Sequence, residues 1–196
     1  GQFVPAAPQH SAATLKLRVF WWLYAAGARG YTRRVTTTGF CMSSAVRIAY
    51  GDFGRVALLD MDRFLVRHAH PHCHVLIKAE GADTHFAVGD QTVALTDTQA
   101  VLVNAWVPHA YVHDPQRPRT TILALYIEPD WLSRFRSNWN SATAPLLFER
   151  PVGELTHEIR ELSMTLASAM VYEPAGAQTQ ETLLARLMIA VMERFT

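Results

Sequence analysis

The chain has 196 residues, 49% hydrophobic and 18% charged, a composition that indicates a folded globular protein and excludes an intrinsically disordered one. Its formal net charge of +1 hides an asymmetry, because residues 1–51 contain six basic side chains and no Asp or Glu. Residues 52–196 therefore carry 12 basic and 17 acidic side chains, and such a body is a poor electrostatic match for nucleic acid. The two cysteines, Cys41 and Cys73, form neither a CxxC pair nor a disulfide framework, so a cytoplasmic location is expected.

Residues 1–41 differ from the rest of the chain, and we interpret them as an N-terminal extension. Their apolar run, Val19–Ala26, is too short to span a bilayer, so no membrane anchor is expected. Met42 precedes a segment that leads into clear strands, which favours a natural start there. A secretion signal, an organelle transit peptide and an amphipathic helix packed on the body remain alternatives.

From Gly54 onward, short β-branched and apolar segments predict an antiparallel sandwich or barrel of seven or eight strands. Gly89-Asp90 predicts a tight hairpin turn, and a Pro-rich loop occupies 114–118. The expected strands are Arg55–Asp60, one or two within Phe64–Ile77, Thr84–Val88, Gln91–Leu95, Ala100–Val103, Val107–His113 and Thr120–Ile127.

The segment Val66–Val75 holds four of the nine histidines, each two positions from the next: His68, His70, His72 and His74. Side chains two apart on an extended strand share one face. Imidazole is the commonest metal ligand in proteins, and several on one face can bind a single ion. The spacing therefore predicts a site for a metal or a polar ligand, and a histidine-rich strand without function is the alternative.

These motifs, in this order, resemble the cupin superfamily, whose fold is a jelly-roll barrel or double-stranded β-helix. The first cupin motif matches His68-Ala-His70, then His74 where the family usually has Glu, and then Gly81. The second matches Asn104-Ala-Trp106-Val-Pro-His109, where the family has Pro-x-Gly-x-x-His. The resemblance implies that His68, His70, His74 and His109 converge inside the barrel as metal ligands. The departures from the motifs leave the metal open among Zn(II), Fe(II), Mn(II) and Ni(II).

Residues 54–196 show a narrower resemblance, to the sensor half of AraC-type transcription regulators. That family has a short helix after the cupin barrel, matched here by Pro129–Phe135, and then a helical dimerisation segment. Two helix-turn-helix units follow in the family. Because this chain ends at Thr196, where they would begin, we expect contact with DNA only through a domain outside the chain.

Further residues are expected to line the pocket and bind a ligand. His72 follows Pro71, which bends the strand, while Asn104 and Trp106 flank the mouth and can hydrogen-bond or stack. Tyr111 and His113 share the strand phase of His109. Cys73 is out of phase with the histidines and is expected in the core. His85 and His157 are expected at the surface.

The chain divides in this interpretation into the extension 1–41, a cupin barrel over 42–150 and a helical hairpin over 151–196. Apolar residues at helical spacing predict helices over Glu154–Tyr172 and Gln178–Phe195, separated by Pro174-Ala-Gly176. Both stripes could cover the barrel, or part of the second could pair with another copy of the chain; we favour a homodimer. The first stripe is Leu155, Ile159, Leu162, Leu166 and Met170, and the second is Leu183, Leu184, Leu187, Met188, Val191 and Met192.

The preferred function is the effector-binding and dimerisation part of an AraC-type regulator, with a small molecule in the cupin pocket, held through a His-bound divalent metal or directly. The alternative is a free-standing metal-dependent cupin enzyme, a dioxygenase or an isomerase. A metal-free, storage-like cupin is a third possibility.

Overall fold

The structure is a computed structural model that describes residues 44–135, 146–172 and 177–196. The expected N-terminal extension, the start at Met42 and the helix break at Pro174–Gly176 lie outside these residues. Among the described residues, no helix has both the length and the apolar content needed to cross a membrane.

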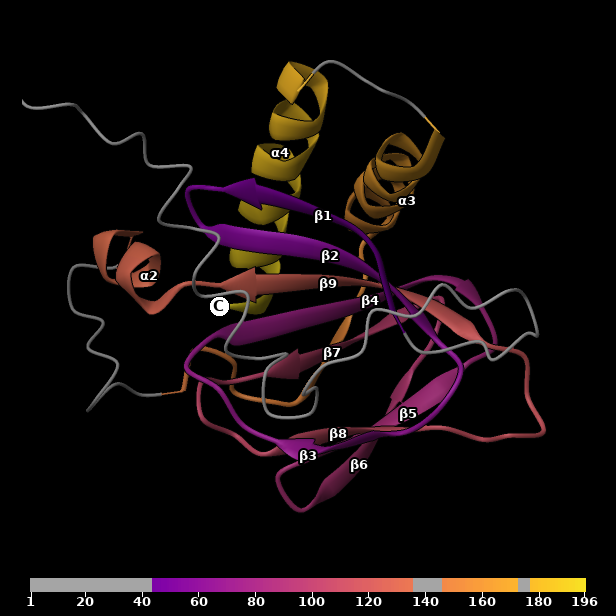
Figure 1. The fold of residues 1–196 in the computed structure, drawn as a ribbon. Helices are drawn as coiled ribbons and strands as arrows, with labels where there is room; N and C mark the ends of the chain where they lie inside the picture. Colours follow the sequence, from indigo (N-terminus) through magenta and orange to yellow (C-terminus); the bar gives the residue numbers. More distant parts are fainter. Residues whose placement is uncertain (1–43, 136–145, 173–176) are drawn as a thin grey trace, which may run out of the picture. The chain divides into compact units, whose positions relative to one another are not determined.

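The described strands form two antiparallel sheets (Figure 1). The six-stranded sheet has the order β1 (Ser44–Gly51), β2 (Gly54–Met61), β9 (Thr120–Ile127), β4 (Cys73–Gly81), β7 (Gln99–Val103) and β10 (Val152–Glu154). The four-stranded sheet has the order β3 (Leu65–His68), β8 (His109–Val112), β5 (Thr84–Val88) and β6 (Gln91–Leu95). Many strands that are neighbours in a sheet are distant in the sequence, as in a jelly roll.

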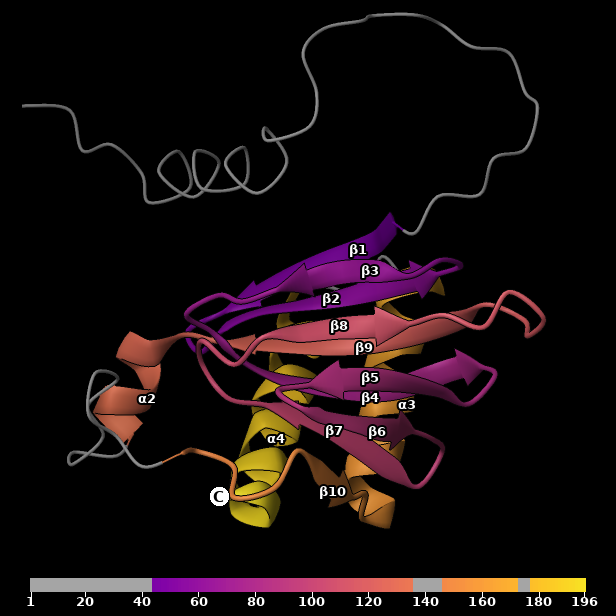
Figure 2. The same ribbon diagram turned by 90° about the horizontal axis from the view of Figure 1, so that it is seen from below.

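The four-stranded sheet lies over one face of the six-stranded sheet (Figure 2). We define the inner core as the buried residues between the two sheets. Alternation along each strand sends one set of side chains inward. On β4, for example, Leu76 enters the inner core while its neighbours Val75 and Ile77 point to the opposite face. The inner core consists of Met61, Leu76, Phe86, Val88, Val93, Leu95, Val101, Val103, Tyr111, Ile122 and Ala124.

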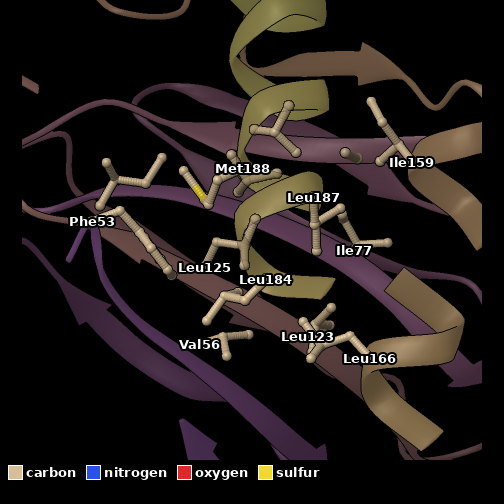
Figure 3. Packing of buried hydrophobic residues seen from close by; sticks show 14 of the residues in the cluster. Phe53, Val56, Ile77, Leu123, Leu125, Ile159, Leu166, Leu184, Leu187 and Met188 are labelled. Atoms are coloured by element: carbon tan, nitrogen blue, oxygen red, sulfur yellow. The ribbon is translucent and has the colours of Figure 1, made fainter. Parts of the chain in front are cut away.

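Two helices cover the outer face of the six-stranded sheet, α3 (His157–Tyr172) and α4 (Ala177–Phe195). Their apolar stripes pack on outward-facing strand residues such as Val56, Ile77 and Leu123 (Figure 3). The shorter α2 (Pro129–Phe135) follows β9 and packs Trp131 edge-on against Phe53, with ring centroids 6.3 Å apart. The predicted mainly β barrel followed by an α-hairpin is confirmed.

The first helix of the hairpin begins later than predicted, at His157 instead of Glu154. Val152–Glu154 pairs with β7 as strand β10, and the Leu155 amide donates to the Thr98 carbonyl. Thr156 then caps α3, because its hydroxyl accepts the Ile159 amide at 3.2 Å. The barrel thus continues into the segment that we had assigned to the hairpin.

Two strands were missed, β1 and the short β10. β1 forms a hairpin with β2, although its residues alternate less clearly than those of later strands. The turn returns through Gly54, whose φ of 135° is left-handed, and a Cβ there would clash with the Tyr126 carbonyl oxygen. Only glycine fits this close approach.

The apolar stripe of α4 does not form a seam between chains. Five of its six residues are buried within this chain, and Leu183 is half-buried against the same cluster. The alternative in which the stripe covers the barrel accounts for all of them. Any dimer contact through the helices must use other faces.

Candidate metal centre

The histidines gather at one end of the barrel, where β3 ends and β4 and β8 begin. His68 and His109 are paired residues on the neighbouring strands β3 and β8. His70 lies in the loop between β3 and β4, and its carbonyl accepts the Trp106 amide at 2.8 Å. This bond ties the β3–β4 loop to the β7–β8 loop, so residues about 35 positions apart form one rim.

The side chains of His68, His70 and His109 converge on one point. One ring nitrogen from each lies within 4.8 Å of those of the other two. Zinc and iron bind imidazole nitrogen at about 2.0–2.1 Å, so ligands on one ion lie within ~4 Å of each other. Ring movements of less than about 1 Å would therefore close the group around an ion.

Backbone carbonyls orient two of these rings. His68 Nδ1 lies 2.9 Å from the Val66 carbonyl oxygen, and His109 Nδ1 lies 2.9 Å from that of Val107. Since a carbonyl only accepts, each Nδ1 carries a proton, so Nε2 is the nitrogen with the lone pair in the neutral ring. This tautomer is the one in which Nε2 binds a metal and the other nitrogen donates to an outer group.

Several buried imidazole nitrogens have no hydrogen-bond partner. Among the described residues these are both ring nitrogens of His70 and His74, Nδ1 of His72 and Nε2 of His109. A buried polar atom without a partner costs about 1–3 kcal/mol, so this group of unpaired nitrogens lowers the stability of the fold. A bound metal or polar ligand removes that cost, and these residues therefore fit a divalent metal held by imidazoles.

Burial favours the neutral form of His70, His74 and His109. It lowers the pKa of His70 to about 3, with further lowering by the neighbouring His109, His72 and His68 and by Arg55. The pKa of His74 falls well below its usual value, mainly by burial, and burial also lowers that of His109 despite its bond to Val107. Neutral imidazole is the form that binds metal.

His74 adjoins this group but is not one of the three converging ligands. Its ring stacks on His70 with centroids 4.2 Å apart and lies 5.2 Å from His109. Tyr126 contacts it edge-on at 4.0 Å. The structure thus brings all four predicted ligands together but converges the nitrogens of three, His68, His70 and His109. A fourth-ligand role for His74 stays a prediction.

The other residues predicted at the mouth have separate surroundings. His72 Nε2 lies 3.1 Å from Glu128 Oε1, so this ring is bonded toward α2. Asn104 is bonded at both ends of its amide to the Phe148 backbone, each at 2.9 Å, which makes it a brace for the loop. Trp106 is 62% exposed, with a left-handed φ of 63° that is rare for a bulky residue. Its ring remains available to a ligand.

Tyr111 and His113 do not adjoin the converging nitrogens. Tyr111 is buried one step deeper in the inner core against Phe86, with ring centroids 5.3 Å apart. Both line a pocket of about 120 Å³ near Gly81 and Thr120. Tyr111 and His113 lie two and four residues beyond His109, so their backbones are ~7 and ~13 Å from it along the strand direction. The predicted phase was right, but the strand carries these side chains away from the metal centre.

Three residues beside the histidines were missed. They are Tyr126, at the end of β9, Arg55, whose guanidinium carbon lies 4.1 Å from the Tyr126 ring centroid, and Glu128. Strand register reveals the first two, because Arg55 pairs with Tyr126 and Tyr126 pairs with His74, while Glu128 follows β9 and contacts His72. The predictions for the remaining residues are confirmed, since Cys73 is buried and His85 and His157 are exposed.

The chain also matches solved structures that are distant in sequence. A cupin superfamily protein from Desulfitobacterium hafniense is 14% identical, with a TM-score of 0.40 over 50% of this chain and 94% of its own. A cupin-2 domain containing protein from Shewanella frigidimarina is 16% identical, with a TM-score of 0.35 over 56% and 95%. AerE from Microcystis aeruginosa is 17% identical, with a TM-score of 0.38 over 52% and 42%.

No curated protein matches the sequence. A family model does match, described as the AraC-like ligand binding domain, and it covers residues 53–190. The match spans strands β2 to β10 and most of the helical hairpin, including His68, His70 and His109. The chain therefore belongs to the AraC-like ligand binding domain family.

Proposed function

We propose that this chain is the effector-binding part of an AraC-type transcription regulator, and that a divalent metal at His68, His70 and His109 takes part in holding the effector. The observation that carries the proposal is the set of buried imidazole nitrogens without partners at the barrel mouth. A small molecule would complete the coordination of the metal, and Trp106 on the rim would stack against it. DNA would be contacted by a separate domain in the cytoplasm.

Metal titration tests this proposal directly. Metal-free protein would be mixed in turn with Zn(II), Fe(II), Mn(II) and Ni(II), and the melting temperature and bound metal measured. We expect one ion per chain and a rise in melting temperature, because a ligand that binds only the folded state stabilises it. No bound metal and no shift with any of the ions would contradict the metal part of the proposal.

We also propose a homodimer through the outward faces of the helices. Met164, Ser168 and Val171 lie at positions i, i+4 and i+7 of α3, all exposed, and Tyr172 beside them is 81% exposed. On α4, Ile189 is 53% exposed. An uncharged helix face of this kind is typical of a contact between helices. The double variant Met164→Glu, Val171→Glu should be monomeric by light scattering, whereas Glu161→Lys at the margin of the face should not.

A metal-dependent enzyme remains the second candidate, because three histidines on one ion leave open positions for a substrate and oxygen. Oxygen uptake by iron-loaded protein with a panel of phenols and thiols separates the two functions. Turnover would favour a dioxygenase. Ligand-dependent melting shifts without turnover would favour the sensor.

A further inference from the structure

We propose that the effector carries a carboxylate or a similar anionic oxygen group, bound between the three-histidine metal centre and Arg55. This inference rests on the proposed function and names the chemical class of ligand for the same site. Its basis is the row of side chains that leads from the histidines to Arg55, together with the balance of charge around them.

The row crosses three adjacent strands in register. Arg55 on β2 pairs with Tyr126 on β9, which pairs with His74 on β4. The His74 and Tyr126 rings touch, with centroids 4.0 Å apart, and the Arg55 guanidinium carbon lies 4.1 Å from the Tyr126 centroid. The backbones of β2 and β4 are about 10 Å apart, a distance that a long arginine and a small organic acid can share.

Tyr126 sets the direction of the arginine. Cation–π contact holds the guanidinium over the ring face, and the same phenol ring lies 6.0 Å from His70, one of the converging ligands. The Tyr126 ring lies between the guanidinium and the His70 ring, so the positive charge of Arg55 lies beside the candidate metal site. Arg55 therefore belongs electrostatically to the metal centre.

The charges at this end of the barrel do not balance without an anion. The converging group consists of three imidazoles, which bind metal in their neutral form, and within the described part of the chain it includes no carboxylate, so a bound divalent ion would keep its full charge of +2. Arg55 adds a further positive charge. The carboxylate of Glu128 is bonded to His72 on the α2 side and is 49% exposed, where water screens it.

A partly buried site with uncompensated positive charge selects an anion. Carboxylate oxygens bind hard and borderline metal ions, and arginine is the side chain best suited to carboxylate because its parallel N–H groups match the two oxygens. One oxygen on the metal and one toward Arg55 satisfies both cations at once. A neutral sugar or alcohol would leave the positive charge of the arginine without a counter-charge.

Benzoate and its neutral counterpart benzamide test the inference on Co(II)-loaded protein, with the cobalt absorption spectrum and calorimetry as readouts. We expect benzoate to bind at least tenfold more tightly than benzamide. Arg55→Gln should reduce benzoate affinity about tenfold and leave benzamide unchanged, while Arg55→Lys retains part of the preference.

Arg67→Gln is the matched control. Arg67 precedes His68 on β3, but its guanidinium donates to the Gly89 carbonyl at 2.8 Å and turns away from the row. Removing it takes the same charge from the same neighbourhood, so benzoate affinity should change less than twofold. Equal binding of benzoate and benzamide, or equal losses in the two variants, would overturn the inference.

His74→Glu gives an independent test in case Arg55→Gln does not fold. A carboxylate in the row would compensate the cations from within, so the preference for benzoate over benzamide should disappear; its survival would count against the inference. Failure of the wild-type protein to take up Co(II) would instead contradict the proposed metal centre, so the two failures are distinguishable.

Discussion

His74 and Lys78 lie four residues apart on the same inward face of β4, and both are almost wholly buried, with 3% and 4% exposure. Lys78 has a full set of acceptors, since its ammonium donates to Asp83 at 2.5 Å, to Asp97 at 3.0 Å and to the Gly81 carbonyl at 3.2 Å. His74 has none for either ring nitrogen. A buried polar side chain thus has hydrogen-bond partners at one end of the barrel and none at the other.

The difference fits a structural role for Lys78 and the proposed ligand-binding role for the histidines. The lysine end is a closed network, which Arg160 of α3 extends by bonding Asp97 at 2.6 Å and the Lys78 carbonyl. It fastens the helical hairpin to the barrel. The histidine end leaves polar atoms unsatisfied, which costs stability unless something binds there. We therefore expect substitutions at the two ends to affect different measurements.

Loss of a converging ligand should have the largest effect. His70→Ala removes one of the three nitrogens, so we expect metal affinity to fall at least about 100-fold in calorimetric titration. His85→Ala on β5 is the control, because that ring is exposed and away from the group. Equal affinity in wild type and His70→Ala would show that the histidines do not form a metal centre.

Replacement of Lys78, which has a full set of hydrogen-bond acceptors, should destabilise the fold. Lys78→Met keeps the apolar stem but removes the ammonium from its three acceptors, so we expect the free energy of unfolding to fall by about 1–3 kcal/mol. Urea unfolding of metal-free protein measures this loss. Metal affinity should stay within about twofold of wild type, because the metal centre lies at the other end of β4.

The same lysine predicts how stability depends on pH. Burial alone would lower the Lys78 pKa, but the hydrogen bonds and charges of Asp83 and Asp97 outweigh it and raise the pKa above 10.5. A group with a raised pKa contributes its stability fully below its unfolded value and loses it as the pH rises through the folded one. Wild type should therefore lose stability above pH 10.5 relative to Lys78→Met. Parallel curves would contradict this.

Replacing His74, whose ring nitrogens have no partner, should have the opposite effect on stability. His74→Leu removes two buried nitrogens without partners, so the metal-free protein should become more stable by about 1 kcal/mol. Because His74→Leu and Lys78→Met each place an apolar side chain on the same face of the same strand, the pair of variants isolates the effect of hydrogen-bond partners. A loss of stability in His74→Leu would mean that the ring's contacts with His70 and Tyr126 contribute more than its unsatisfied nitrogens cost.

The sequence was most informative where the signal is local. The hairpin at Gly89-Asp90 and the strands beside it lie as predicted, since turn chemistry and alternation act over a few residues. The alternating histidines and the Pro-His motif likewise predicted that His68, His70 and His109 lie together. Alternation predicted a shared face for the histidines of the β3–β4 segment, and the resemblance to the second cupin motif implied that His109 lies with them.

Contacts between residues that are far apart in the sequence leave no pattern that a short stretch of sequence reveals. Arg55 and Tyr126 are 71 positions apart, and only the register of β2 on β9 brings them to the histidines. The stripe of α4 indicated burial but not the surface that buries it. Tyr111 and His113 shared the phase of His109, yet phase says nothing about how far along the barrel a strand carries each side chain.

Cys73 gives the smallest predicted effect and tests the other face of β4. It precedes His74 but points away from it, into the helix-covered core with 1% exposure, and burial raises the pKa of its thiol to about 11. At pH 8 about one thiol in a thousand would be ionised, against about one in ten at the usual pKa of 9.0. In a Cys41→Ser variant, alkylation of the native protein should therefore be at least about 100-fold slower than in urea. Equal rates would show that the face of β4 under the helices is open to solvent, and the contrast between a dry outer face and a ligand-binding inner face would not hold.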